Sequence, residues 1–85
     1  MKKIYCQINS RAGLHARPAL MLVRCVKSLE STVYLCVNDK KIHVNDPVKI
    51  MTLRILYGTI VMFEVNGVNE IQDTEILKTF CNNNL

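Results

Sequence analysis

Apolar and polar residues alternate in four segments of the chain, and this alternation is typical of strands with one buried face. The segments are residues 2–9, 31–38, 41–44 and 59–66. Asn38-Asp39-Lys40 stands between two of them and is a turn signal, which predicts a β-hairpin. The inward positions carry apolar residues: Ile4, Cys6, Ile8, Val33, Leu35, Val37, Val61, Phe63 and Val65.

Helical spacing of apolar residues marks residues 16–29, with Pro18 in the first turn. Proline is tolerated there because first-turn N–H groups have no partner within the helix. The core face of this helix is expected to carry Ala19, Leu22, Val23, Val26 and Leu29. Residues 45–54 predict a second, short helix, with Asp46 as its cap and Pro47 at its first position.

Residues 70–81 predict the last helix, and residues 82–85 are expected to form a frayed end. Glu70, Asp73 and Glu75 cluster near the start of this helix, where the helix dipole favours acids. Its inner side is expected to carry Thr74, Leu77, Phe80 and Cys81.

The order of these elements, β-α-β-β-α-β-α, predicts one α+β domain over residues 1–85. The expected architecture is a four-stranded antiparallel sheet with three helices on one face. A chain of 85 residues can bury one small core.

Composition and cysteine spacing narrow the class of protein. With 49% hydrophobic and 21% charged residues, the chain is globular and not disordered. No apolar run approaches the ~20 residues of a membrane helix, and no signal peptide is seen, so we expect a cytoplasmic protein without membrane insertion. The four cysteines fall in four different elements without a C-x-x-C pair, so we expect free packing thiols and no metal site.

Charge is distributed unevenly along the chain. Residues 1–54 hold ten Lys or Arg and three acids, a net charge of +7, whereas residues 55–85 hold one Lys and four acids, a net charge of −3. A basic region of this kind indicates an acidic or phosphorylated partner, such as an acidic protein surface or a nucleic acid.

The stretch AGLHARPAL (12–20) places His15 between a glycine loop and the start of the first helix. The N–H groups of Ala16 and Arg17 are among the unpaired donors of that helix start, which forms a ready anion site. The positive end of the helix disfavours a charged imidazole, so we expect a nucleophilic ring. The Arg17 guanidinium matches phosphate oxygens. Together these residues predict a histidine that accepts a phosphoryl group and passes it on.

A second stripe runs along the same helix at Arg17, Leu20, Met21 and Arg24, beside the core face. Large apolar side chains flanked by arginines indicate a docking surface. Val48 and Met51 of the short helix are expected to extend this surface.

The motif GLHARPA (13–19) resembles the active-site signature of the HPr family, the histidine-containing phosphocarriers of the bacterial sugar phosphotransferase system. The resemblance covers nearly the whole chain and includes DPVKIMTL (46–53), where the family has its second short helix. It implies an HPr-like open-faced β-sandwich. It also implies a carrier without cofactors that is not itself an enzyme. Phosphoenolpyruvate, through enzyme I, supplies the phosphoryl group, and enzyme IIA units of sugar transporters receive it.

The resemblance also assigns roles to residues of this chain. His15 would accept the phosphoryl group through its Nδ1 atom, with help from Arg17. The docking residues for both partners would be Leu20, Met21, Val48 and Met51, with charge supplied by Arg24, Lys27 and Lys49. We expect a monomer that does not bind nucleic acid.

Asp46 departs from the pattern of many Gram-positive relatives, which have at this position a serine that HPr kinase phosphorylates. Aspartate cannot form that phosphoester. Its charge of −1 only partly imitates the roughly −1.5 to −2 of phosphoserine. Two interpretations therefore stay open: a helix cap, or a permanent imitation of the phosphorylated state.

Two other functions remain open on the sequence alone. One is a regulatory or nitrogen-type HPr paralogue that uses the same histidine but reports to a kinase or a transcription regulator. The other is a small ferredoxin-like nucleic-acid-binding module, in which Tyr5 and Tyr34 would stack on bases. The chain lacks a Gly-aromatic-x-aromatic run that would favour this second class.

Overall fold

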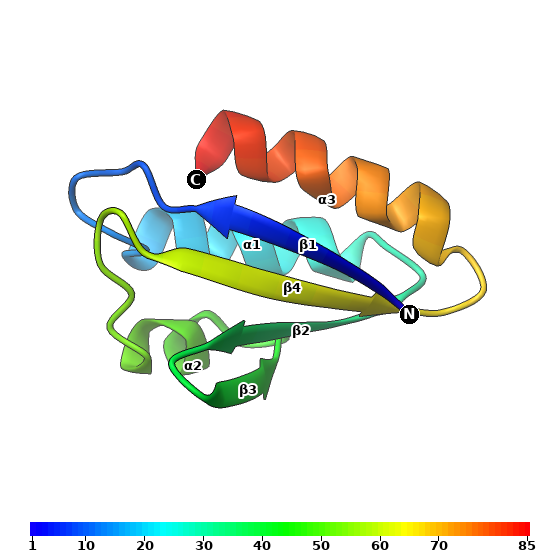
Figure 1. Cartoon of the computed structure of the whole chain (residues 1–85), viewed down its shortest axis with the longest axis horizontal. Helices are drawn as coiled ribbons and strands as arrows, with labels where there is room; N and C mark the ends of the chain where they lie inside the picture. Colours follow the sequence, from blue (N-terminus) through cyan, green and yellow to red (C-terminus); the bar gives the residue numbers. More distant parts are fainter.

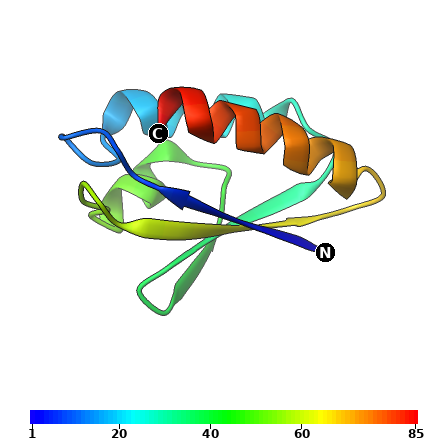
Figure 2. The same cartoon turned by 45° about the horizontal axis from the view of Figure 1, so that its top comes forward.

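Four strands form one antiparallel sheet in the order β1-β4-β2-β3, and three helices lie on one of its faces (Figures 1 and 2). This computed structural model describes residues 1–85. The fold class predicted from the pattern is confirmed. In chain order the elements are β1 (Lys2–Gln7), α1 (Ala16–Lys27), β2 (Thr32–Val37), β3 (Lys40–His43), α2 (Pro47–Thr52), β4 (Ile60–Asn66) and α3 (Glu70–Asn84).

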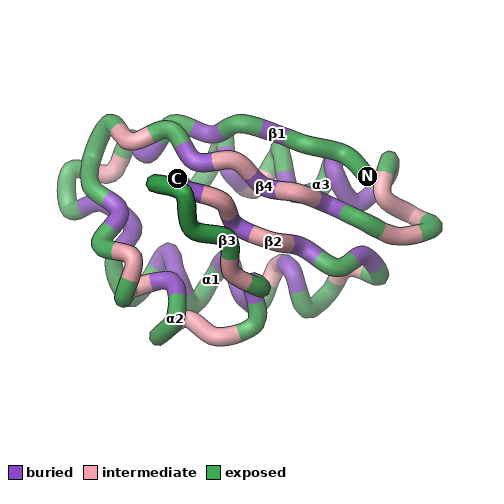
Figure 3. Tube along the Cα trace, turned by 60° about the horizontal axis from the view of Figure 1, so that its bottom comes forward, coloured by how far each residue is buried: buried purple, intermediate pink, exposed green.

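The strand register brings the predicted inward residues together under the helices. Phe63 of β4 lies opposite Ile4 of β1 and Leu35 of β2, and all three side chains are buried. Figure 3 shows the resulting alternation of buried and less buried positions along the strands. The predicted core face of α1 is buried except for Leu29, which is half-buried and packs against the core.

Two local predictions, the β2–β3 turn and the cap of α2, are confirmed by the structure. In the β2–β3 hairpin, Asn38 and Asp39 have φ values of 51° and 65°, the left-handed conformation that a two-residue turn requires and that these residue types tolerate. At the start of α2, the Asp46 carboxylate accepts a hydrogen bond of 2.9 Å from the Val48 N–H, with Pro47 in the first turn.

The predicted frayed end is wrong. Helix α3 continues through Asn84, and the side chain of Leu85 is buried in the core. The Leu85 carbonyl oxygen also accepts a hydrogen bond of 2.7 Å from the N–H of Asn9, which follows β1. Burial of Leu85 stabilises a helical turn that three consecutive asparagines would not form on their own. The end of α3 therefore lies beside the β1–α1 loop (Figure 1).

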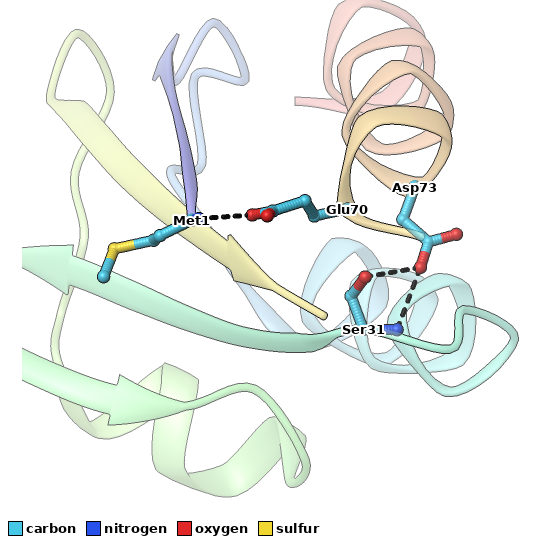
Figure 4. Close-up of polar contacts among 4 residues, drawn as sticks. All are labelled: Met1, Ser31, Glu70 and Asp73. Atoms are coloured by element: carbon cyan, nitrogen blue, oxygen red, sulfur yellow. Dashed lines mark hydrogen bonds and ion pairs between the residues drawn. The ribbon is translucent and has the colours of Figure 1, made fainter. Parts of the chain in front are cut away.

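Asp73 accepts hydrogen bonds from a distant segment of the chain. Its position in the sequence suggests only an interaction with the helix dipole. Its carboxylate is buried and accepts hydrogen bonds from the Glu30 N–H (3.1 Å), the Ser31 N–H (2.9 Å) and the Ser31 hydroxyl (2.6 Å). Close by, the amino group of Met1 pairs with Glu70 at 2.6 Å (Figure 4). The Asp73 contacts join α3 to the α1–β2 connection, and the Met1 pair joins α3 to the start of β1, at the end of the molecule opposite the β1–α1 loop.

Candidate functional site

His15 is the N-cap residue of α1, with extended backbone angles (φ −92°, ψ −168°). Its carbonyl oxygen accepts a hydrogen bond from the Ala19 N–H at 3.0 Å, but its exposed imidazole caps no N–H group of the helix. The N–H groups of Ala16 and Arg17 therefore have no partner within the chain, and Pro18 has no N–H. An anion can take up these free donors.

The loop before His15 is fastened to the segment that follows α2. Leu14 is buried, and its N–H donates to the Ile55 carbonyl oxygen at 2.9 Å. Gly13 has φ 73°, and a Cβ at this position would lie only 2.4 Å from the same oxygen. Only glycine fits both the backbone angle and the space. This contact brings α2 beside the start of α1.

The imidazole of His15 has a defined orientation. Its Nδ1 atom lies 3.2 Å from the Gly13 carbonyl oxygen, which can only accept a hydrogen bond. A neutral ring in this conformation can donate to that oxygen only with its proton on Nδ1, which leaves the lone pair on Nε2. Attack through Nδ1, which the resemblance implies, requires the ring to release this contact and move its proton to Nε2.

His15 and Arg17 line a surface depression of about 320 Å³. Its other lining residues are Ser10, Pro18, Met21, Asn83 and Asn84, and no carboxylate side chain is among them. The sequence reasoning missed Ser10 and the two asparagines. No local signal could have identified the asparagines, because only the tertiary contact at Leu85 brings the end of α3 here.

The second depression on the molecule, of about 400 Å³, lies on the uncovered face of the sheet. Its lining includes Tyr5, Met62 and Lys41 but none of the residues predicted to serve a phosphocarrier. This depression is therefore separate from the site around His15.

The predicted docking residues of α1 and α2 form what we call the α1–α2 surface: Leu20, Met21, Arg24, Lys27, Val48, Lys49 and Met51. Leu20 and Val48 are 41% and 59% exposed, and Met21 is also exposed, as expected. Met51 is half-buried and packs against the core, so it offers less surface than predicted. The exposed apolar residues Leu56 and Tyr57, which the sequence reasoning missed, lie in the segment beside Gly13.

The cations of the α1–α2 surface are free to meet an acidic partner. Arg24, Lys27 and Lys49 are exposed, and none of them is in an ion pair. Lys49 donates only to the neutral amide oxygen of Asn45, at 2.9 Å. Opposite charges on a partner would therefore not compete with ion pairs inside this chain.

The four cysteines are free thiols in four different elements, as predicted. Burial raises the pKa of Cys25, and burial together with the nearby Glu64 carboxylate raises the pKa of Cys36. A hydrogen bond with Cys6 raises the pKa of Cys81 and lowers that of Cys6. None of the four lines the His15 depression.

A family model described as "PTS HPr component phosphorylation site" matches residues 2–83 of this chain. The chain belongs to the HPr family. The resemblance of the GLHARPA motif is thereby confirmed, and with it the role of a phosphocarrier of the phosphotransferase system.

Relatives named phosphocarrier protein HPr agree with this family. The one from Haemophilus influenzae is 31% identical over 71 residues, which cover 84% of each chain. The one from Mycoplasma capricolum is 27% identical over 78 residues, covering 92% of this chain and 88% of the relative. A crystal structure of HPr from Thermoanaerobacter tengcongensis superposes with a TM-score of 0.89 at 26% identity, covering 99% of this chain and 94% of the other.

None of the three helices has the length and apolar character that crossing a bilayer demands.

Proposed function

We propose that this phosphocarrier accepts a phosphoryl group from phosphorylated enzyme I on His15 and passes it to enzyme IIA units of sugar transporters. One observation carries the proposal: His15 and Arg17 line one depression, at a helix start whose first two N–H groups are unpaired. This arrangement combines a nucleophile with donors for a dianion.

In the transfer step, a ring nitrogen of His15 uses its lone pair to form a bond to phosphorus. The bond between phosphorus and the donor breaks, and its electron pair leaves with the donor. The Ala16 and Arg17 N–H groups and the Arg17 side chain bind the phosphoryl oxygens. Passing the group on reverses these roles, with His15 as the leaving group.

Partner recognition is assigned to the α1–α2 surface. Leu20 and Val48 supply exposed apolar area, and the unpaired cations supply long-range attraction to acidic partners. Both partners use this surface in turn, since it adjoins the one reactive histidine.

The structure argues against a nucleic-acid platform on the sheet. The Tyr34 ring is half-buried and already packs against the His43 ring at a centroid distance of 5.4 Å, with the Lys41 ammonium 4.8 Å from its centroid. Of the two predicted stacking residues, only Tyr5, 72% exposed, remains free to stack on a base.

Intact-protein mass spectrometry after incubation with phosphoenolpyruvate and the native enzyme I tests the proposal. We expect one acid-labile, base-stable phosphoryl group that is absent in His15→Ala. Arg17→Ala should slow the transfer by about 10- to 100-fold, the loss of one charge-assisted contact. Arg11→Ala removes an exposed arginine outside the depression and should transfer at the wild-type rate. Absence of the phosphoryl group with native enzyme I would refute the proposed function.

A further inference from the structure

The depression beside His15 is lined in part by the C-terminal end of α3. Asn83 and Asn84, in the last turn of α3, form part of its wall together with His15 and Arg17. The hydrogen bond from Asn9 to Leu85 and the burial of Leu85 hold this turn in place.

The two asparagines differ in what their side chains already do. The Asn84 amide donates to the Phe80 carbonyl oxygen at 3.0 Å and is used within the helix. Asn83 is exposed, and its carboxamide makes no hydrogen bond within the chain. Its N–H₂ group is therefore a free donor, on a residue that lines the depression together with His15 and Arg17.

The partial charge at this end of α3 makes a hydrogen-bond donor there favourable for binding an anion. The last turn contains no Lys or Arg, and the carbonyl end of a helix is partly negative. Left bare, that end would repel a phosphoryl dianion on His15. The Phe80, Cys81 and Leu85 carbonyl oxygens accept hydrogen bonds from the Asn84 side chain, the Leu85 N–H and the Asn9 N–H, whereas those of Asn82 to Asn84 accept none within the chain. A neutral donor side chain at this end offsets part of that negative charge. Asn83 lines the depression, and its unpaired carboxamide is a neutral donor for a phosphoryl oxygen there.

We propose that the Asn83 carboxamide binds the phosphoryl group carried on His15, by donating a hydrogen bond to one of its oxygens. The inference rests on the proposed phosphorylation of His15 and adds a ligand from the opposite end of the chain. The phosphoryl oxygens would then have three kinds of ligand: the charged Arg17 side chain, the backbone N–H groups at the start of α1, and the neutral Asn83 carboxamide.

Asn82 is a matched control. It is also an exposed asparagine in the last turn of α3, but it does not line the depression. Substitutions at positions 82 and 83 change helix propensity in the same way, so a difference between them reports the position of the side chain and not the stability of the turn.

The first experiment needs no partner protein. Phosphoramidate, a small chemical donor, phosphorylates His15 directly, and ¹H–¹⁵N NMR follows the side-chain amides. We expect the Asn83 amide protons to shift downfield on phosphorylation while those of Asn82 stay unchanged. Unchanged Asn83 amides, or equal shifts at both residues, would overturn the inference. This result is independent of whether enzyme I recognises the chain.

The second experiment measures the equilibrium of phosphorylation with phosphoenolpyruvate, pyruvate and enzyme I. Asn83→Ala should lower the equilibrium constant about 10-fold, as expected for loss of a hydrogen bond to a charged group. Asn83→Asp should lower it further, because a carboxylate replaces the donor. Asn82→Ala and Asn82→Asp should stay within about 2-fold of wild type. Equal effects at the two positions would contradict a contact at Asn83, whereas a wild-type chain that takes phosphate only from phosphoramidate would contradict the proposed function instead.

Discussion

The two ends of the helical layer treat their polar groups in opposite ways. At the Asp73 end, a buried carboxylate accepts three hydrogen bonds from Glu30 and Ser31. At the His15 end, the N–H groups of Ala16 and Arg17 are exposed and unpaired. A buried polar group without a partner is costly, whereas an exposed donor costs little and can bind a ligand. One end therefore stabilises the fold, and the other is available for chemistry.

The largest effect on stability is expected at the buried end. Asp73→Ala leaves three donors without their acceptor and should lower the free energy of unfolding by about 3 kcal/mol. Ser31→Ala removes only the hydroxyl and should cost about 1 kcal/mol. Urea denaturation measures both.

Glu75→Ala, an exposed acid on the same helix, is the control and should stay within about 0.5 kcal/mol of wild type. The folded fraction of Asp73→Ala should still accept a phosphoryl group at the wild-type rate. If Asp73→Ala keeps its stability, or if its folded fraction is no longer phosphorylated, the two ends do not have the separate roles described above.

Gly13→Ala should disturb both properties at once. Its Cβ would lie 2.4 Å from the Ile55 carbonyl oxygen, at a backbone φ of 73°. We expect a loss of about 2 kcal/mol and slower phosphorylation, since the loop that positions His15 must move. At Gly58, where φ is 84° but the space is open, alanine should cost only about 1 kcal/mol. Equal losses at the two glycines would show that the contact with Ile55 is unimportant.

The backbone of Arg54 is strained, and this residue lies near the His15 loop. It is a non-glycine residue with φ 52°, directly before the Ile55 that holds the His15 loop. Arg54→Gly should raise the free energy of unfolding by up to about 1 kcal/mol, because glycine adopts this angle without strain. Arg54→Ala retains the strain and should give no gain. Thermal unfolding of the two variants separates strain from side-chain loss.

The smallest effect is expected on the uncovered sheet face, remote from both ends. The Lys41 ammonium lies 3.0 Å from Glu64, and this pairing lowers the pKa of Glu64 and raises the pKa of Lys41. The stabilisation is present above the ordinary glutamate pKa of about 4.3 and is lost as the pH falls through the lowered value. It is likewise lost as the pH rises through the raised pKa of Lys41.

Thermal unfolding of Glu64→Gln should therefore differ slightly from wild type near pH 7, and the difference should vanish in strong acid. The control is Glu75→Gln, which removes an unpaired exposed carboxylate and should show no such dependence. A difference that persists below about pH 2 would exclude the ion pair as its cause.

The sequence predicts what depends on neighbouring residues. The strands follow from alternation, the β2–β3 hairpin from Asn38-Asp39, and the start of α2 from Asp46 and Pro47. The position of His15 at a helix start follows from the glycine before it and the proline after it. Each of these features is determined within a few residues by backbone preference.

The features that were missed depend on contacts between distant segments. In the sequence, Asp73 looks like any other acid in the first turn of a helix. Its hydrogen bonds to Ser31 exist only in the folded structure. Residues 82–84 resemble a frayed end because asparagine is a poor helix former, and only the burial of Leu85 reverses that preference. The same contact brings Asn83 to the depression of His15. Met51 was expected to extend the docking surface of α1, yet it packs partly against the core.

The most direct test of the contrast between the two ends is a backbone ¹H–¹⁵N NMR comparison of the unphosphorylated and phosphorylated protein. The amides of Ala16 and Arg17 should shift far downfield, because they gain a phosphoryl acceptor. The amides of Glu30 and Ser31 should stay unchanged, because their acceptor is already Asp73. Unmoved Ala16 and Arg17 amides, or shifts as large at Glu30 and Ser31, would contradict the contrast between the two ends.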